Sequence, residues 1–355
     1  MKDKTPLRDP EEDENYFEFY QEHRSVKPGT IRAYSTAWEH LETFCEQSGY
    51  GTDDVGVPEV QEFCDYLKQI EGLGERTAED YVIYLRAICR WLQDRGVIEY
   101  NPFAIVLEDD DPFSYPDETI KREIPVDELR KALEQADPLL FTLLTLLLKT
   151  GVRIGEAVNL DYQDIHLDHP ISEEMPSPRK EIAARPDSIY IDSSISEKEV
   201  HNGELRDNAN KPNSFRSIPV DEELKKTLVW YIAMSQRSET PQPLFRSPGL
   251  VTVSRLKRNR ANKLIREFSD EMGWIVDGEN YFTAHWCRHW FTTTLEDNIS
   301  RELVEQGTVA DYVAALRGDT DSRTISIYRQ GHWGDNEWKK TAYESGMPKL
   351  FTGGQ

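Results

Sequence analysis

Apolar side chains recur at helical spacing through roughly the first third of the chain, and this pattern limits the folds open to it. Three stripes share the spacing: Ile31, Tyr34, Trp38, Leu41 and Phe44; Val60, Phe63, Cys64 and Leu67; and Tyr81, Tyr84, Leu85, Ile88, Trp91 and Leu92. Residues three and four apart share one face of a helix, so each stripe predicts a helix with one buried side. Thr30 and Thr77 are predicted N-caps. The pattern predicts a small helical bundle over residues 13–105.

Shifts in composition predict the limits of the domains. Residues 1–12 are charged and predict a disordered tail. Residues 106–122 are acidic and interrupted by proline, which is typical of a linker between domains. A second domain is expected over residues 123–338, with a tail over residues 339–355 that contains scattered apolar side chains.

The second domain is predicted to be helical with a small β-sheet, so the whole chain is expected to be mainly α. The patterns predict helices over 126–136 and 139–149 and strands over 188–192 and 217–220. The polar stretches 166–187 and 193–210 are expected to be exposed loops.

Composition narrows the class of protein. With 38% hydrophobic residues over 355 positions, the chain can fill real cores, and disorder throughout is excluded. Its longest apolar run, Leu139–Leu148, is about half the roughly 18 residues of a membrane span. The cysteines lack metal-ligand spacing, and the N-terminus lacks an apolar signal-peptide core. These features predict a reduced cytoplasmic protein without a membrane segment or a metal site.

A turn at Gly151 separates the buried helix from another predicted helix and places two charged residues beside each other. Glu156 follows Arg153 by about one helical turn and is expected to fix the orientation of its guanidinium. An ordinary salt bridge on a helix surface is the alternative interpretation of this pair.

Five dispersed residues form a set suited to attack on a phosphodiester: Arg153, Lys211, His285, Arg288 and Tyr328. Arginine forks match phosphate oxygens, and a tyrosine oxygen can act as a nucleophile that holds a covalent intermediate. Such chemistry needs no cofactor, and none is expected here. Because the chain has 16 tyrosines, a structural role on a terminal helix is the alternative for Tyr328.

The formal net charge of −23 argues against a nucleic-acid partner, since such proteins are usually basic. Screening of an acidic surface in a very salty cytoplasm is the interpretation that we favour. Its support is residues 255–266, which carry six cations and no acid. These cations are the predicted DNA-binding residues: Arg255, Lys257, Arg258, Arg260, Lys263 and Arg266. A solvated helix face is the alternative for this segment.

Several short blocks together resemble the tyrosine recombinases, the Xer and phage-integrase group. They are Lys149–Glu156, His285–His289, and Leu316–Asp319 followed by Tyr328, and the resemblance extends over about residues 14–335. It implies a helical core-binding (SAM-like) domain followed by a tyrosine-recombinase catalytic domain.

The resemblance also implies roles for the five residues. Arg153 and Arg288 would bind the phosphate oxygens, and the oxygen of Tyr328 would attack the phosphorus. His285 would accept the tyrosine proton or donate a hydrogen bond to the phosphate. The family places its lysine five residues before an arginine that leads into a short strand. Here Arg216 gives Lys211 as the general acid, with Lys198 as the alternative.

Asp319 departs from the family pattern, since many members have His or Trp at this position. As an anion it would repel phosphate, so we expect it to hold Arg317 or another cation. We expect Asp319→Ala to retain cleavage and Asp319→His to keep or improve it. His332 is a weak substitute for the missing donor.

The resemblance implies a site-specific recombinase that cleaves and rejoins double-stranded DNA through a 3′-phosphotyrosyl intermediate. It would act as a homotetramer on DNA, with the tail docking on a neighbouring subunit. A halophilic archaeon, or its virus or plasmid, is the expected source. Two alternatives stay open: an enzyme like a type IB topoisomerase, and a catalytically silent DNA-binding regulator of recombination.

Overall fold

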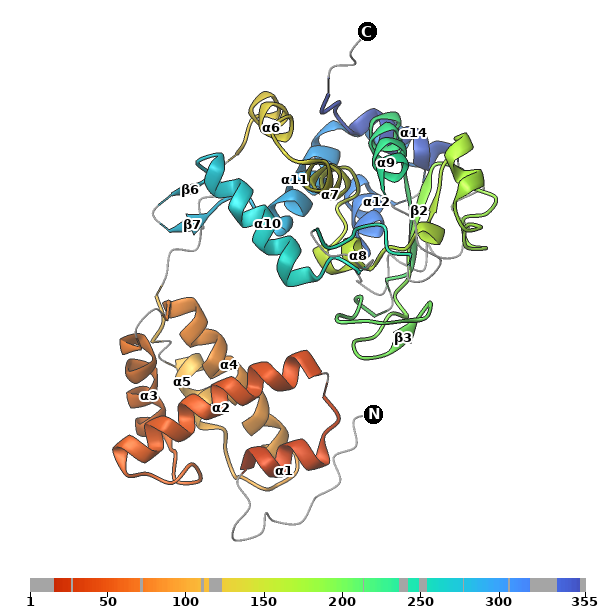
Figure 1. The fold of residues 1–355 in the computed structure, drawn as a ribbon. Helices are drawn as coiled ribbons and strands as arrows, with labels where there is room; N and C mark the ends of the chain where they lie inside the picture. The colour runs from red at the N-terminus through yellow and green to blue at the C-terminus, as the bar shows by residue number, and fades with distance from the viewer. Residues whose placement is uncertain are drawn as a thin grey trace. The chain divides into compact units, whose positions relative to one another are not determined.

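A computed structural model describes residues 16–26, 28–70, 73–109, 112–114, 123–212, 214–235, 242–248, 254–276, 278–305, 307–319 and 337–351. The chain divides into two compact units, Met1–Ile120 and Lys121–Gln355 (Figure 1). No helix among the described residues is long and apolar enough to cross a membrane.

The N-terminal unit is a bundle of helices, as the apolar stripes predict. Its described helices are α1 (Tyr16–His23), α2 (Pro28–Ser48), α3 (Val57–Gln69), α4 (Glu75–Gln93) and α5 (Pro102–Asp109). The predicted stripes face one another, and Leu41, Phe63 and Leu85 are almost fully buried between α2, α3 and α4. This apolar core stabilises the unit because it removes three helix faces from water.

Helix starts and the linker differ from the sequence prediction. α2 begins at Pro28, because a proline in the first turn loses no hydrogen bond there. α4 begins after an extended Gly74. Thr30 and Thr77 therefore lie inside helices and are not N-caps. α5 continues to Asp109 with Val106 buried in the core, so residues 106–109 are helical instead of linker.

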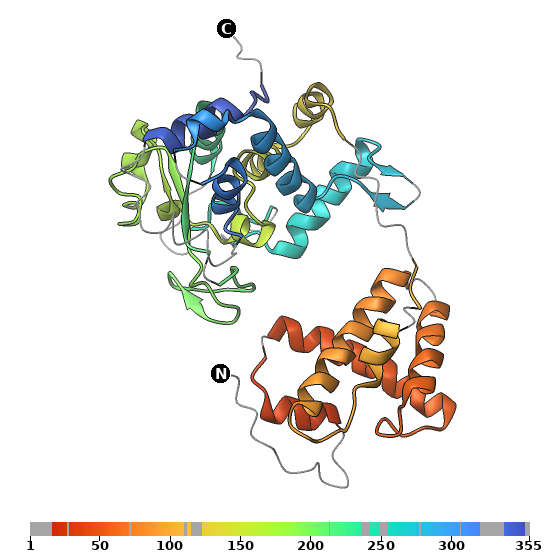
Figure 2. The ribbon, with the colours of Figure 1, turned by 180° about the vertical axis from the view of Figure 1, so that it is seen from behind.

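The C-terminal unit packs helices around a small sheet, seen from two sides in Figures 1 and 2. Its described helices are α6 (Val126–Leu133), α7 (Pro138–Thr150), α8 (Ile154–Asn159), η1 (Tyr162–Asp164), η2 (Pro170–Glu174), α9 (Glu222–Met234), α10 (Arg258–Glu271), α11 (Ala284–Asn298), η3 (Arg301–Leu303), α12 (Val309–Arg317) and α14 (Glu337–Gly346). Its described strands are β1 (Ile165–His166), β2 (Ser188–Ile191), β3 (Val200–His201), β4 (Glu204–Leu205), β5 (Arg216–Pro219), β6 (Ile275–Val276) and β7 (Glu279–Asn280).

The strands form one antiparallel sheet and two hairpins. The sheet has the order β1–β2–β5, with Ile189 paired to Ile165 on one side and to Ile218 on the other. This confirms strands close to the two predicted positions. The remaining pairs, β3–β4 and β6–β7, are short two-stranded ribbons.

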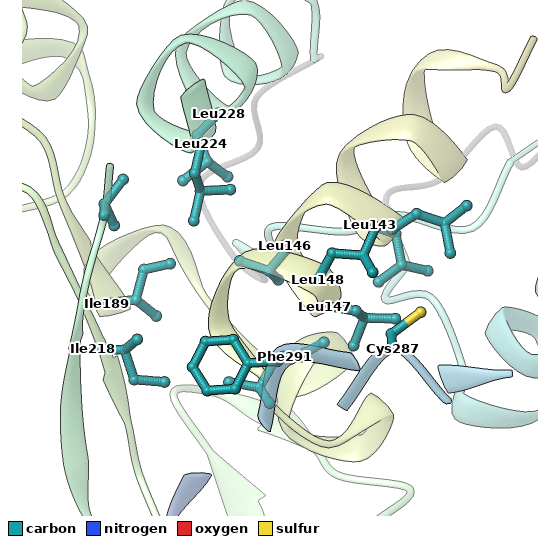
Figure 3. Close-up of a cluster of buried hydrophobic side chains, with 14 of the residues drawn as sticks. Leu143, Leu146, Leu147, Leu148, Ile189, Ile218, Leu224, Leu228, Cys287 and Phe291 are labelled. Atoms are coloured by element: carbon teal, nitrogen blue, oxygen red, sulfur yellow. The ribbon is translucent and has the colours of Figure 1, made fainter. Parts of the chain in front are cut away.

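α7 lies at the centre of the core. Its leucines share one buried cluster with side chains of the sheet, α9 and α11, and Figure 3 shows Leu147 beside Cys287 of α11. The helix ends at Gly151, whose φ of +60° and close approach to Phe291 exclude a larger residue: an added Cβ would lie 2.4 Å from that ring. The turn that precedes Arg153 is therefore fixed against α11.

The polar stretch 193–210 is more ordered than its sequence suggests, which corrects the prediction of an exposed loop. It contains the β3–β4 hairpin, and the residue after β4 is the fully buried Arg206. The Arg206 guanidinium donates to Asp161 at 2.7 Å, which gives the buried charge a partner. The stretch 166–187 likewise contains β1's last residue and η2.

The segment after residue 338 packs on its own chain, so the apolar residues that suggested docking on a neighbour are already buried. Ala342, Tyr343, Met347 and Leu350 are buried in the C-terminal core. The Tyr343 hydroxyl donates to the carbonyl of Lys149 at 2.7 Å. The buried Lys149 ammonium donates to the carbonyl of Pro348 at 2.9 Å. Residues 352–355 lie outside the described residues.

Candidate active site

Four of the five predicted catalytic residues line one cleft in the C-terminal unit. Arg153 stands just before α8, Lys211 precedes β5, and His285 and Arg288 lie on α11. The cleft has a volume of about 490 Å³. Tyr328 and His332 lie outside the described residues.

Glu156 orients Arg153, as the spacing of the two residues predicts. Its carboxylate accepts from the Arg153 backbone N–H at 2.9 Å and from the Arg153 guanidinium at 3.1 Å. The same carboxylate accepts two bonds from Arg216, at 2.7 and 3.2 Å. Burial alone would raise the pKa of Glu156, but Arg216 and Arg153 outweigh it and lower this pKa to about 2. One buried anion thus holds two arginines.

Arg288 is almost fully buried and fixed by carbonyl groups. Its guanidinium donates to the carbonyl of Gly151 at 2.5 Å and to that of Arg317 at 3.0 Å. Burial and the charge of Arg153 lower the pKa of Arg288 to about 9, against the opposite effect of Asp319. These contacts join the end of α7 to the end of α12. The guanidinium also lines the cleft, where its Nη2 donates to Asp319 at 2.7 Å.

Lys211 reaches the cleft because the preceding residue is anchored. Asn210 is buried, and its amide donates to the carbonyl of Asp192 at 2.7 Å and accepts from Asn159 at 2.9 Å. Lys198, the alternative lysine, lies two residues before β3 with a φ of +63° and is not part of the cleft lining. The anchoring Asn210 was missed in the sequence because its partners are distant along the chain.

His285 lies in the first turn of α11, which Thr283 caps by accepting from the N–H of Trp286 at 3.1 Å. Its Nε2 is 3.0 Å from the Nε2 of His289, and the two rings are nearly perpendicular. A hydrogen bond between the two nitrogens requires one to donate and the other to accept. His289 was not predicted as a site residue, although its position one turn after His285 was a usable signal.

Asp319 follows the C-cap Gly318 of α12 and places its carboxylate among the cations of the cleft. Among the described residues, four cations lie within ion-pair distance of it: Arg153 at 2.6 Å, Arg288 at 2.7 Å, Arg317 at 3.0 Å and Lys211 at 3.9 Å. Burial would raise its pKa, but the arginine charges lower the pKa of Asp319 on balance. The expectation that Asp319 holds Arg317 or another cation agrees with these contacts.

The predicted DNA-binding segment divides into one structural arginine and an exposed row. Arg255 precedes α10 and donates to the carbonyls of Val158 and Leu160 at 2.8 and 3.0 Å, and to Glu204 at 2.7 Å. Because these partners occupy its guanidinium, Arg255 cannot also bind a phosphate. The structure therefore contradicts the prediction that Arg255 binds DNA.

The remaining cations of the segment are exposed: Lys257, Arg258, Arg260, Lys263 and Arg266. Lys257 pairs with Asp207 at 3.0 Å, and Arg260 and Lys263 approach Glu267 at 3.8 and 3.7 Å. Arg258 lies on the rim of the cleft. Exposed pairs of this kind are weak, so these cations can exchange their acidic partners for another anion.

Comparisons with known proteins find similar sequences and similar folds. Residues 14–109 match the phage integrase SAM-like domain family. The tyrosine recombinase XerC of Oceanobacillus iheyensis is 28% identical over 158 residues, which are 43% of this chain and 50% of that protein. The chain therefore spans about half the length of the curated relative that it matches.

Two solved structures resemble the chain over most of its length. The Tn1549 transposon integrase in complex with transposon right end DNA has a TM-score of 0.61 at 18% identity and covers 93% of this chain and 96% of its own. A lambda integrase tetramer bound to a Holliday junction has a TM-score of 0.57 at 15% identity and covers 87% and 77%. The chain thus has a SAM-like helical domain followed by a domain with the fold seen in these integrase structures.

Proposed function

We propose that this protein is a site-specific tyrosine recombinase that cleaves and rejoins DNA strands through a 3′-phosphotyrosyl intermediate. The observation that carries the proposal is the convergence of Arg153, Lys211, His285 and Arg288 on one cleft. These residues come from segments far apart in the sequence. A surface that only needed charge would not require buried anchors such as those of Arg288 and Asn210.

The reaction follows from the charges in the cleft. The Tyr328 oxygen forms a bond to phosphorus while the bond from phosphorus to the 5′-oxygen breaks. His285 takes the phenol proton, and Lys211 gives a proton to the leaving 5′-oxygen. Arg153 and Arg288 bind the non-bridging oxygens as negative charge builds on them. The new phosphodiester keeps the bond energy, so a 5′-hydroxyl of another strand reverses the step.

Double-stranded DNA is the proposed partner, and a homotetramer is the proposed active assembly. The lambda integrase structure, a tetramer bound to a Holliday junction, supports both. Analytical ultracentrifugation of Tyr328→Phe with duplexes that carry the recombination site tests the assembly. We expect four chains with two duplexes, and a single chain on each duplex at saturating concentration would contradict the tetramer.

Covalent trapping tests the proposed activity. The wild type and Tyr328→Phe are incubated with genomic DNA fragments in high salt, denatured, and the protein-linked DNA is sequenced. We expect adducts with the wild type only, focused on one sequence. Dispersed adducts, with relaxation of plasmids that lack the site, would instead identify a topoisomerase-like enzyme. Native DNA binding without any adduct would identify a silent regulator.

Arg258, on the rim of the cleft, and Arg255, which is bound by its own chain, should respond differently to substitution. Arg258→Ala is expected to weaken DNA binding at all sequences and to lower the slope of log K against log salt by about 1, without a change in Tm. Arg255→Ala is expected to lower the free energy of unfolding by about 3 kcal/mol, because Asp161 and Glu204 lose their buried partner. Equal effects of the two variants on salt dependence would contradict this division.

The acidic composition leads to a separate proposal about the environment. We propose a cytoplasmic protein of a salt-rich cell, because a net charge of −23 destabilises a compact chain unless salt screens it. The free energy of unfolding is expected to rise between about 0.1 M salt, where the screening length is about 10 Å, and about 1 M, where it is about 3 Å. Full stability in dilute buffer would contradict this proposal.

A further inference from the structure

The Asp319 carboxylate pairs with the same arginines that are proposed above to bind the phosphate. Its Oδ1 atom bridges the Arg153 and Arg288 guanidiniums at 2.6 and 2.7 Å, and Lys211 approaches the same oxygen at 3.9 Å. Its Oδ2 atom pairs with Arg317 at 3.0 Å. Arginine forks bind a carboxylate and a phosphate through the same donors, so these donors cannot bind both anions at once.

The charges around Asp319 explain why an acid is stable there. Arg288 is 4% exposed, and Glu156, the other acid among the described residues that line the cleft, is already engaged by Arg216 through two hydrogen bonds. Asp319 is therefore the main counter-ion of Arg288. A buried cation without a counter-ion is costly, so the DNA-free protein gains stability from an internal anion at this point.

The position of Asp319 also allows its carboxylate to move away from Arg153 and Arg288. Its side chain is 34% exposed, whereas the Glu156 side chain is 1% exposed, and Gly318 before it adopts a left-handed turn with a φ of +66°. Lys211, at 39% exposure, is equally open to solvent. An entering anion can thus replace the carboxylate from the solvent side without disturbing the buried Glu156–Arg216 pair.

We infer that Asp319 is a built-in competitor for the phosphate site: it fills the site in the DNA-free protein and must be displaced by the scissile phosphate. This inference deepens the proposed function, on which it rests for the identity of the incoming phosphate. A DNA complex that supplies binding energy elsewhere opens the site most readily, whereas isolated phosphates and weakly bound DNA compete poorly with the carboxylate. The site is thereby closed against unspecific cleavage.

Binding of inorganic phosphate to the DNA-free protein tests the inference without any cleavage step. Asp319→Asn keeps the size of the side chain and removes the charge, and Asp297→Asn is the matched control at an exposed aspartate on α11. We expect Asp319→Asn to bind phosphate at least about fivefold more tightly than the wild type in a phosphorus NMR titration, since the apparent affinity of a self-occupied site is the intrinsic affinity multiplied by the fraction of molecules in which the site is open. Asp297→Asn should match the wild type.

The position of the bound phosphate distinguishes direct replacement of the Asp319 carboxylate from a general effect of charge on phosphate affinity. A crystal structure of Asp319→Asn grown with phosphate should place the ion between Arg153 and Arg288, where the carboxylate lies in the wild type. If Asp319→Asn does not fold, Asp319→His serves in its place. Equal phosphate affinity of the position-319 variant and the wild type, or a phosphate bound elsewhere, would overturn the inference.

The two proposals fail in different ways. Tighter phosphate binding by Asp319→Asn without any DNA adduct from the wild type would retain the competitor and reject the recombinase. A wild-type adduct at Tyr328 with unchanged phosphate binding would retain the recombinase and reject the competitor.

Discussion

Arg153→Lys is expected to lower the rate of covalent adduct formation by about 10²- to 10³-fold, the loss typical of removing one donor to a developing oxyanion. Arg153 is held by Glu156 on one side and faces the cleft anion on the other. A lysine keeps the charge but cannot donate in two directions from a planar fork. The rate is measured as single-turnover adduct formation on a DNA fragment that carries the site.

The control is Arg301→Lys, at an exposed position where the guanidinium donates to the carbonyl of Val304 at 2.6 Å. This variant should retain the wild-type rate. The backbone N–H of Arg153, which bonds to Glu156, is unchanged by the substitution, so the Tm of Arg153→Lys should stay near that of the wild type. A wild-type rate in Arg153→Lys would exclude this residue from phosphate binding.

Glu156→Gln is expected to lower the free energy of unfolding by about 3–5 kcal/mol, the cost of breaking a buried ion pair by removing one partner. The amide cannot accept all the bonds that Arg216 and Arg153 donate, and Arg216 is 5% exposed, so its charge loses its main partner. Urea denaturation measures the effect. Glu222→Gln, at an exposed acid 3.6 Å from Lys225, should change stability by less than about 1 kcal/mol.

The pH dependence of this difference follows from the pKa of Glu156. The pKa falls from an ordinary value to about 2 on folding, so the ionised group stabilises the fold above about pH 4.3. That contribution is lost as pH falls toward 2. The stability gap between the wild type and Glu156→Gln should therefore be constant from pH 7 to 5 and shrink below pH 4. A gap that grows on acidification would contradict the assignment.

The parts of the fold and site that could be predicted are those set by local spacing. The apolar stripes predicted the helical bundle, because periodicity alone decides which face of a helix is buried. The Arg153–Glu156 pair was predictable because the two residues lie on one helical turn. By contrast, the pair between Glu156 and Arg216 joins α8 to β5 and depends on how the sheet packs, which no local pattern encodes.

The errors have a common physical origin. Counting cations in residues 255–266 could not reveal that folding brings Asp161 and Glu204 to Arg255. The apolar residues of the last segment suggested a neighbouring subunit, but the same chain provides the surface that buries Tyr343 and Leu350. In both cases the contacting residues are distant in sequence. Composition could therefore indicate that these side chains contact something, but it could not identify the surface that they contact.

The most direct test of the proposed reaction is to identify the covalent linkage between protein and DNA. The trapped wild-type adduct is digested with nuclease and trypsin, and the peptides are sequenced by mass spectrometry. The tryptic fragment Thr324–Arg329 contains Tyr328 as its only tyrosine. We expect a nucleotide joined through its 3′-phosphate to Tyr328, with a free 5′-hydroxyl on the other DNA end. A linkage to another residue, or to a 5′-phosphate, would contradict it.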